Sequence, residues 1–200
     1  MATITTGTFQ RSDRHSMVLA PLGFAVSMAV PVGVIIAGIA DQGWGAISWG
    51  GAAVWGAVAT VAFTLFSMAG KAMGMTDMDL LDLLGSVVRE PRTAGSKAVG
   101  TVIHHVNGAI LGIGGAYAAV LANEPFDWVS GLWWGAALWV LAMLMITTVG
   151  SVHPAIRRHA QDDPGPAATN FGTMTPIGSL AGHLVWGVVL GLLYNAWPLG

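Results

Sequence analysis

The chain has 200 residues, of which 54% are apolar and only 9% are charged, and its mean hydropathy is +0.66. A soluble domain of this length carries far more surface charge, so the composition excludes an ordinary globular protein and indicates an integral membrane protein. The formal net charge of −2 gives no basis for nucleic-acid binding. Because the chain has no cysteine, disulfides, thiolate metal sites and cysteine nucleophiles are excluded.

Apolar runs along the chain predict an all-α polytopic bundle of five transmembrane helices, each long enough to cross a bilayer. Basic residues Arg11 and Arg14 precede the first run. That run is too long for the hydrophobic part of a signal peptide, so we expect it to remain as a helix. The five predicted helices cover residues 16–40, 46–70, 98–121, 131–149 and 177–196.

The connection between the second and third predicted helices contains a shorter apolar pattern. Thr76 is placed to cap a helix there, and Pro91 is placed to end it. The pattern is too short to cross a bilayer, so it predicts a short amphipathic helix that lies at the membrane surface or docks on a neighbour. Its apolar stripe consists of Leu80, Leu81, Leu84, Val87 and Val88.

The basic residues predict the orientation in the membrane. With five crossings, all eight Lys and Arg residues fall in segments on one side: Arg11, Arg14, Lys71, Arg89, Arg92, Lys97, Arg157 and Arg158. Because cytoplasmic loops are enriched in Lys and Arg, we expect the N-terminus and the amphipathic helix to be cytoplasmic and the C-terminus to be external. Tryptophans near the external helix ends fit an interfacial aromatic belt: Trp44, Trp49, Trp128, Trp133 and Trp197.

Two segments of the chain repeat one another. His104 is followed by glycines four and eight residues later, and so is His183, which lies 79 residues further along the chain. The same offset places Trp55 on Trp134. We therefore predict a leading part with the N-tail and first helix (residues 1–45), followed by two duplicated helical hairpins (46–121 and 122–200). Parallel repeats of this kind are related by a pseudo-twofold axis along the membrane normal.

A helix with the pattern His-x-x-x-Gly-x-x-x-Gly after an apolar hairpin resembles that of a group of small, uncharacterised four-helix bacterial membrane proteins. The resemblance covers residues 50–196 and depends on His104, Gly108 and Gly112 and on their second copy. It implies a helical bundle in the bacterial cytoplasmic (inner) membrane. It implies no activity, and the leading helix is an addition to the pattern.

The repeated residues are the candidate site. Gly108, Gly112, Gly187 and Gly191 form faces that allow helix backbones to approach closely. His104 and His183 are costly inside a bilayer and therefore face the bundle interior, where they could ligate haem b, a pigment or a metal, with Gly108 and Gly187 leaving room for a flat ring. They could equally bond to a neighbouring helix, or lie on an ion or proton path. His105 and Asn107, present only in the first repeat, could line a cavity or bond across a helix interface.

The sequence contains no recognised catalytic arrangement. There is no phosphate loop or HExxH helix, and the five predicted helices contain no Asp or Glu. A non-catalytic accessory, assembly or scaffold subunit is therefore the leading hypothesis. Its expected partners are the lipid bilayer and other membrane subunits or a second copy. The alternatives are a cofactor-binding protein that uses His104 and His183 as ligands, and a small transporter or channel.

Overall fold

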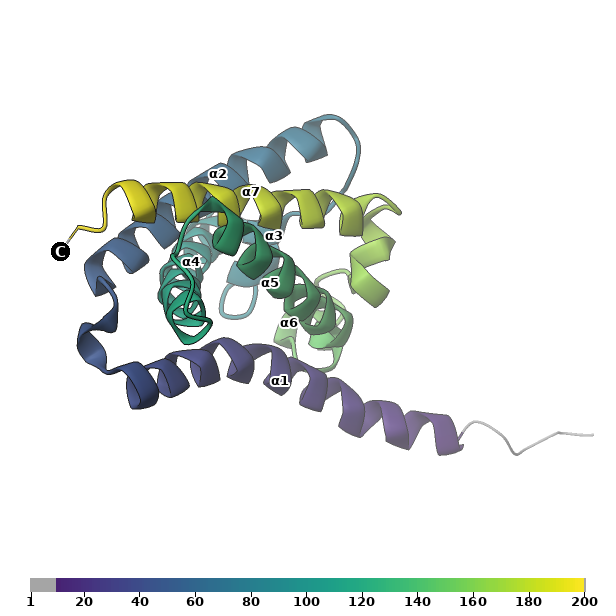
Figure 1. The fold of residues 1–200 in the computed structure, drawn as a ribbon. Coiled ribbons are helices and arrows are strands. Elements are labelled where there is room, and N and C mark those ends of the chain that lie inside the picture. Colours follow the sequence, from purple (N-terminus) through teal and green to yellow (C-terminus); the bar gives the residue numbers. More distant parts are fainter. Residues whose placement is uncertain (1–9, 200) are drawn as a thin grey trace, which may run out of the picture.

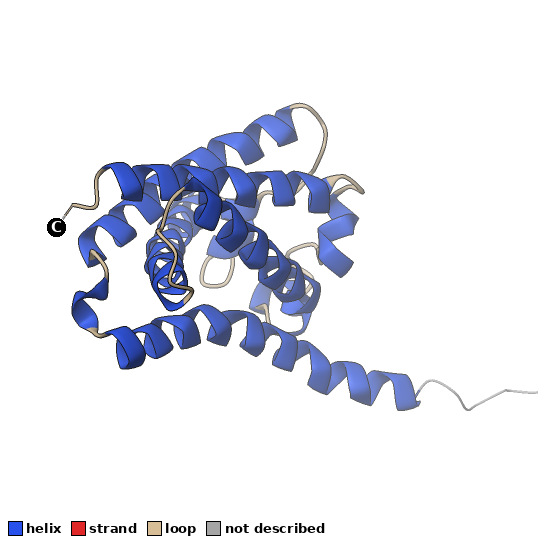
Figure 2. Ribbon diagram, in the orientation of Figure 1, coloured by secondary structure: helices blue, strands red, loops and turns tan. Residues whose placement is uncertain are grey.

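The computed structural model describes residues 10–199, and the side chains of residues 21–199. In this part of the chain every regular element is a helix, and the fold is all-α (Figures 1 and 2). The long helices are α1 (Gln10–Gln42), α2 (Trp49–Ala72), α4 (Ala94–Leu121), α5 (Trp128–Thr148) and α7 (Thr175–Ala196). The short ones are η1 (Trp44–Ala46), α3 (Leu80–Gly85), η2 (Val149–Ser151), α6 (Pro154–Arg157) and η3 (Pro166–Phe171).

Membrane-spanning length and composition are found in four helices of the described residues. They cover Pro21–Gln42, Trp49–Ala72, Trp128–Arg157 and Thr175–Ala196. The chain is thus a helical membrane protein by length and composition. The remaining predicted helix, residues 98–121, is found as α4, but it is less apolar than these four because His104, His105 and Asn107 interrupt it.

Helix α4 joins the two ends of the molecule. At its beginning the hydroxyl of Ser96 donates to Asp82, and near its end the hydroxyl of Tyr117 donates to the carbonyl oxygen of Gly43, 3.2 Å away, in the turn that precedes α2. In Figure 1, α4 is seen close to end-on, whereas α2 and α7 run across the view, so α4 crosses them rather than lying parallel to them. α4 is thus bonded near its beginning to the segment after α2 and near its end to the turn before α2.

The long helices pack in a defined order. α2 contacts α4, α5 contacts α7, and a contact between α2 and α7 joins the two pairs. α1 covers α4 and α5. Tyr117, Leu190 and Trp186 are among the buried side chains of the core that these helices share. Figure 1 places the beginning of α1 and the C-terminus at opposite ends of the molecule.

The two polar connections, residues 73–93 and 149–174, pack on one another at one end of the bundle, and we call them the polar platform. Nε2 of His153 lies 3.0 Å from the carbonyl oxygen of Leu83, and the backbone N–H of Asp77 donates to Phe171. A second apolar cluster holds the two connections together: Leu83, Ile146, Val149, Ile156 and Ala168. The predicted amphipathic helix is α3, which ends at Gly85 rather than continuing to Val88, and Asp79 rather than Thr76 caps it.

Six of the eight basic residues lie in or beside the polar platform: Lys71, Arg89, Arg92, Lys97, Arg157 and Arg158. Lys71 and Lys97 reach it through Asp79, at 3.7 and 2.8 Å from the carboxylate. The side chains of Arg11 and Arg14 lie outside those that the structure describes. The described basic residues at the ends of these helices thus gather at one end of the bundle.

Candidate functional site

The glycines of the first repeat lie where α4 crosses α2. A Cβ atom at Gly112 would overlap the carbonyl oxygen of Ala52 and lie 3.0 Å from Cα of Gly56. A Cβ at Gly108 would overlap the hydroxyl of Thr60. The two helix backbones are therefore in direct contact, which only glycine permits at these positions.

The glycines of the second repeat lie between α7 and α5. A Cβ at Gly187 would overlap the carbonyl oxygen of Gly131 and lie 3.3 Å from Cα of Gly135. These two contacts are the counterparts, at an offset of 79 residues, of those that Gly112 makes with α2. By the same offset, however, Gly187 corresponds to Gly108 and not to Gly112. The contact between α7 and α5 is therefore displaced by four residues, about one helical turn, relative to the contact between α4 and α2.

Both repeated histidines pack against the same phenyl ring, that of Phe63 on α2. The ring centroid of His104 lies 5.4 Å from that of Phe63, and the centroid of His183 lies 5.0 Å from it, both in edge-to-face geometry. Gly182, next to His183, leaves the space for this ring, because a Cβ there would lie 2.9 Å from Phe63. The sequence analysis did not single out Phe63, which is one apolar residue among many in its helix.

The hydrogen bonds of the two histidines differ. Nδ1 of His183 lies 2.8 Å from the carbonyl oxygen of Ser179, so this nitrogen carries a proton and donates it. Nε2 of His104 is buried and has no hydrogen-bond partner among the described residues. If one metal ion were bound by both imidazole rings, a ring nitrogen of His104 and a ring nitrogen of His183 would lie within roughly 4 Å of each other. In the described part of the chain, no three His, Asp or Glu side chains form a group that could hold a metal ion.

A buried hydrogen-bond cluster lies beside the histidines. Nε1 of Trp186 on α7 donates to the hydroxyl of Thr60, 3.0 Å away, and lies 3.3 Å from the carbonyl oxygen of Gly56. Thr60 in turn donates to Gly56 over 2.8 Å. The cluster connects α7 to α2 at the point where α4 crosses, and no sequence motif indicated it.

The face of α4 that points away from α2 is exposed. Val102, Val106 and Ile110 are 64%, 52% and 40% exposed, as expected for side chains that meet lipid. Asn107 is exposed on the same side of the helix, midway between its ends. The central part of α4 therefore presents a polar amide on an otherwise apolar surface.

Asp82 is the buried acid of the polar platform. It is only 3% exposed and accepts hydrogen bonds from the backbone N–H of Arg92, the hydroxyl of Ser96 and the side-chain amide of Gln161. These donors come from the chain before α4, from α4 itself and from the second connection. One carboxylate thus holds three segments together, and all three contacts are structural.

Asp79 caps α3 and faces two lysines in a pocket of about 270 Å³. Burial acts to raise the pKa of Asp79. The hydrogen bonds from Lys97 and from the backbone N–H of Asp82 outweigh that effect, and together with the charge of Lys71 they hold the pKa below its usual value. The carboxylate therefore stays ionised and paired at neutral pH.

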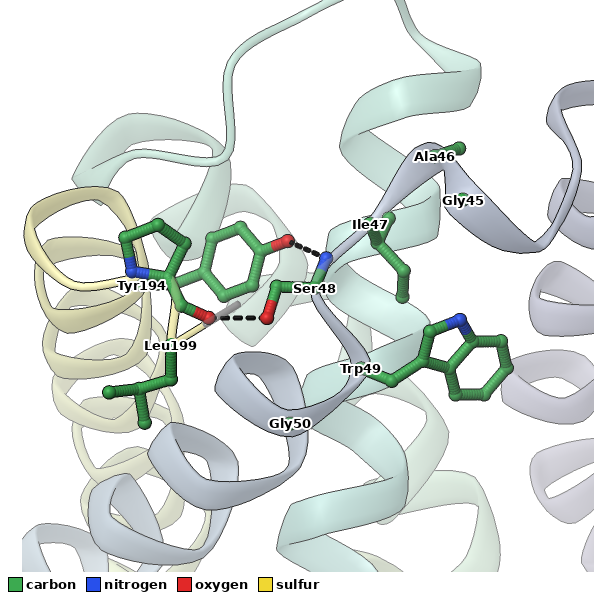
Figure 3. Close-up of a pocket in the computed structure, with 9 residues that line it drawn as sticks. Gly45, Ala46, Ile47, Ser48, Trp49, Gly50, Tyr194 and Leu199 are labelled. Atoms are coloured by element: carbon green, nitrogen blue, oxygen red, sulfur yellow. Dashed lines mark hydrogen bonds between the residues drawn. The ribbon is translucent and has the colours of Figure 1, made fainter.

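A second, more open pocket of about 520 Å³ lies at the opposite end of the bundle, where α2 begins (Figure 3). The hydroxyl of Tyr194 accepts a hydrogen bond from the backbone N–H of Ser48, and the hydroxyl of Ser48 donates to the carbonyl oxygen of Pro198. Trp55 also donates to the carbonyl oxygen of Trp197. These contacts fasten the residues after α7 to the beginning of α2.

Residues 47–198 match a protein family described as a family of unknown function, DUF6789. The match covers α2, α4, α5 and α7 and does not include α1. No curated protein and no solved structure matches the chain. The family description gives no activity.

Proposed function

The chain belongs to this DUF6789 family, and we propose that it is a non-catalytic integral membrane protein that acts as an accessory, assembly or scaffold subunit. In this proposal its exposed α4 face binds a transmembrane helix of a partner. The observation that carries the proposal is Asn107, a hydrogen-bonding amide exposed midway along α4.

An exposed amide at this depth favours association with another helix. A polar group facing hydrocarbon is costly, and hydrogen bonds between helices satisfy such groups in membranes. Around Asn107 the surface of α4 is apolar, with Val106 and Ile110 beside it. A partner helix would bury these side chains and supply the amide with a donor and an acceptor.

We further propose that α4 crosses the bilayer, which gives five crossings and two duplicated hairpins after a leading helix. Its bonds from Ser96 to Asp82 and from Tyr117 to Gly43, at opposite ends of the bundle, support this proposal. In this arrangement the polar platform is cytoplasmic because it gathers the basic residues, and the C-terminus is external. The membrane would be a bacterial inner membrane.

Photo-crosslinking tests the proposed function. A photoreactive residue in place of Val106 should give a covalent adduct with a membrane protein in native membranes, and Asn107→Leu should remove most of it. Asn195→Leu serves as the matched control, because Asn195 is also exposed but lies at the end of α7. A protein that forms no adduct and migrates as a lone monomer in mild detergent would contradict the proposal.

A second candidate function is cofactor binding through the histidines, and one observation favours it. Nε2 of His104 is buried with no partner among the described residues, so a bound group would satisfy it. The visible spectrum of protein purified from cells supplied with haem tests this candidate. An absorbance band that disappears in both His104→Ala and His183→Ala would support it, and a colourless, metal-free preparation would exclude it.

A further inference from the structure

We propose that α1 acts within the membrane as an insertion partner for α4, so that α4 crosses the bilayer because α1 packs against its second half. This inference rests on the five crossings proposed above and assigns a role to α1, which lies outside the matched family range. α1 is the most apolar of the four helices with membrane-spanning composition, so it needs no partner of its own to enter the bilayer.

α4 is the long helix of the described residues that lacks membrane-spanning composition. Its middle carries three polar side chains, His104, His105 and Asn107. Its second half, residues 112–121, consists mostly of glycine and alanine. These small residues bury little apolar surface, so they gain little free energy from lipid compared with leucine or isoleucine. α4 therefore depends on neighbouring helices for its place in the bilayer more than the other long helices do.

The order of the helices along the chain leaves two neighbours to receive α4. α5 and α7 follow α4 in the sequence, so only α1 and α2 have been made when α4 emerges during synthesis. α2 contacts the first half of α4 and the beginning of the second, at Gly108 and Gly112. α4 and α5 approach each other at few positions, whereas α1 packs along both of them (Figure 1). α1 is thus the helix available to cover the rest of the second half of α4.

The contact between α1 and α4 is centred on Tyr117. A Cβ atom at Gly38 on α1 would overlap the ring of Tyr117 and lie 2.8 Å from its Cβ, so glycine lets the ring lie directly against the α1 backbone. Tyr117 is completely buried, and its hydroxyl donates to the carbonyl oxygen of Gly43, directly after α1. Two helical turns before Gly38, the carbonyl oxygen of Pro31 lies 3.7 Å from the position of a Cβ at Gly114. α1 therefore holds the second half of α4 along two turns of helix.

Cysteine labelling tests the inference, because the natural sequence has no cysteine and an introduced one is the only thiol. Gln42→Cys marks the turn after α1, and Glu124→Cys marks the turn after α4; both residues are exposed. With five crossings the two cysteines lie on the same side of the membrane, so a membrane-impermeant maleimide labels both in sealed membrane vesicles of the same orientation. If α4 does not cross, Glu124→Cys lies on the side opposite to Gln42→Cys.

Gly38→Leu should remove most of the labelling of Glu124→Cys from the side of Gln42→Cys, because the leucine side chain would push α1 away from Tyr117. Overpacking of a close contact shifts an equilibrium by roughly 5- to 100-fold. Gly33→Leu is the matched control, since it makes the same change of composition in α1 but a Cβ there meets nothing within 4 Å. Its labelling should equal that of the natural chain.

The outcomes separate this inference from the five crossings on which it rests. Loss of Glu124→Cys labelling in Gly38→Leu alone, with Gln42→Cys still labelled from its usual side, would support the inference. Equal labelling of Glu124→Cys in Gly38→Leu and Gly33→Leu would overturn it and leave the five crossings standing. Labelling of Glu124→Cys from the opposite side in the otherwise natural chain would overturn both. A change at Gln42→Cys in Gly38→Leu would place the defect in α1 itself and would overturn the inference.

Discussion

Replacing Gly187 by alanine should separate α5 from α7 and lower the stability of the bundle. The added Cβ would overlap the carbonyl oxygen of Gly131, and Cα of Gly135 lies only 3.3 Å from the same position. Both obstacles are backbone atoms, so no change of side-chain rotamer relieves them. The helices must move apart, and the close contact of the neighbouring glycines is lost with them.

The expected loss follows from two opposing effects. Overpacking of this kind costs about 1–3 kcal/mol, and a rigid backbone obstacle favours the upper part of that range. Alanine has a higher helix propensity than glycine, which stabilises the folded helix by up to about 1 kcal/mol. A net loss of about 2 kcal/mol remains, which corresponds to a fall in Tm of about 4–8 °C for a chain of this size.

Thermal unfolding in detergent, followed by the fluorescence of the nine tryptophans, measures this effect. Gly178→Ala is the matched control, because Gly178 lies in the same helix and a Cβ there would meet nothing within 4 Å. Its Tm should stay the same or rise slightly. Equal Tm values for Gly187→Ala and Gly178→Ala would refute the view that backbone contact at Gly187 holds the two helices together.

Three further substitutions or conditions test other contacts. Asp82→Ala removes the acceptor of the Arg92 backbone N–H and the Gln161 amide, while Ser96 can still donate to Thr93, so it should cost about 2 kcal/mol or more and make the polar platform sensitive to limited proteolysis. Because the folded-state pKa of Asp79 is below its ordinary value of 3.8, its pairing stabilises the fold above that pH and is lost as the pH falls through the folded pKa. The Tm difference between the natural chain and Asp79→Asn should therefore shrink below about pH 4. Trp186→Phe removes the bonds to Thr60 and Gly56 and should cost about 1 kcal/mol in thermal unfolding, whereas Trp133→Phe, at a residue 71% exposed, should cost almost nothing.

The helical fold could be predicted from the sequence because a bilayer leaves few alternatives for long apolar runs. The third predicted helix, residues 98–121, is found as Ala94–Leu121, and the first, residues 16–40, extends to Gln10–Gln42. The observed helix ends differ from the predicted ones because capping residues, and not the apolar run alone, determine where a helix begins. Thr93 and Ser96 form a capping box that begins α4 four residues earlier than the apolar run indicates.

The site could be predicted only in part. The repeat pattern singled out His104 and His183, but spacing within each helix does not determine what packs between two helices. Phe63 has no counterpart in the second repeat, where residue 142 is alanine, so the duplication gave no sign of it. The importance of Asp82 was also hidden, because its donors Ser96 and Gln161 come from segments that only the folded chain brings together.

The last residues after α7 are hydrogen-bonded to the beginning of α2, which strengthens the contact between the two pairs of matched helices. Ser48 and Trp55 hold the carbonyl oxygens of Pro198 and Trp197, more than 140 residues away along the chain. Helix ends usually fray, but the residues after α7 are held by these hydrogen bonds. Amide hydrogens at the end of α7 should therefore exchange with solvent as slowly as those in its middle. This contact adds to the packing of α2 on α7, which joins the two pairs of helices. We therefore expect the two hairpins to unfold together as one cooperative unit.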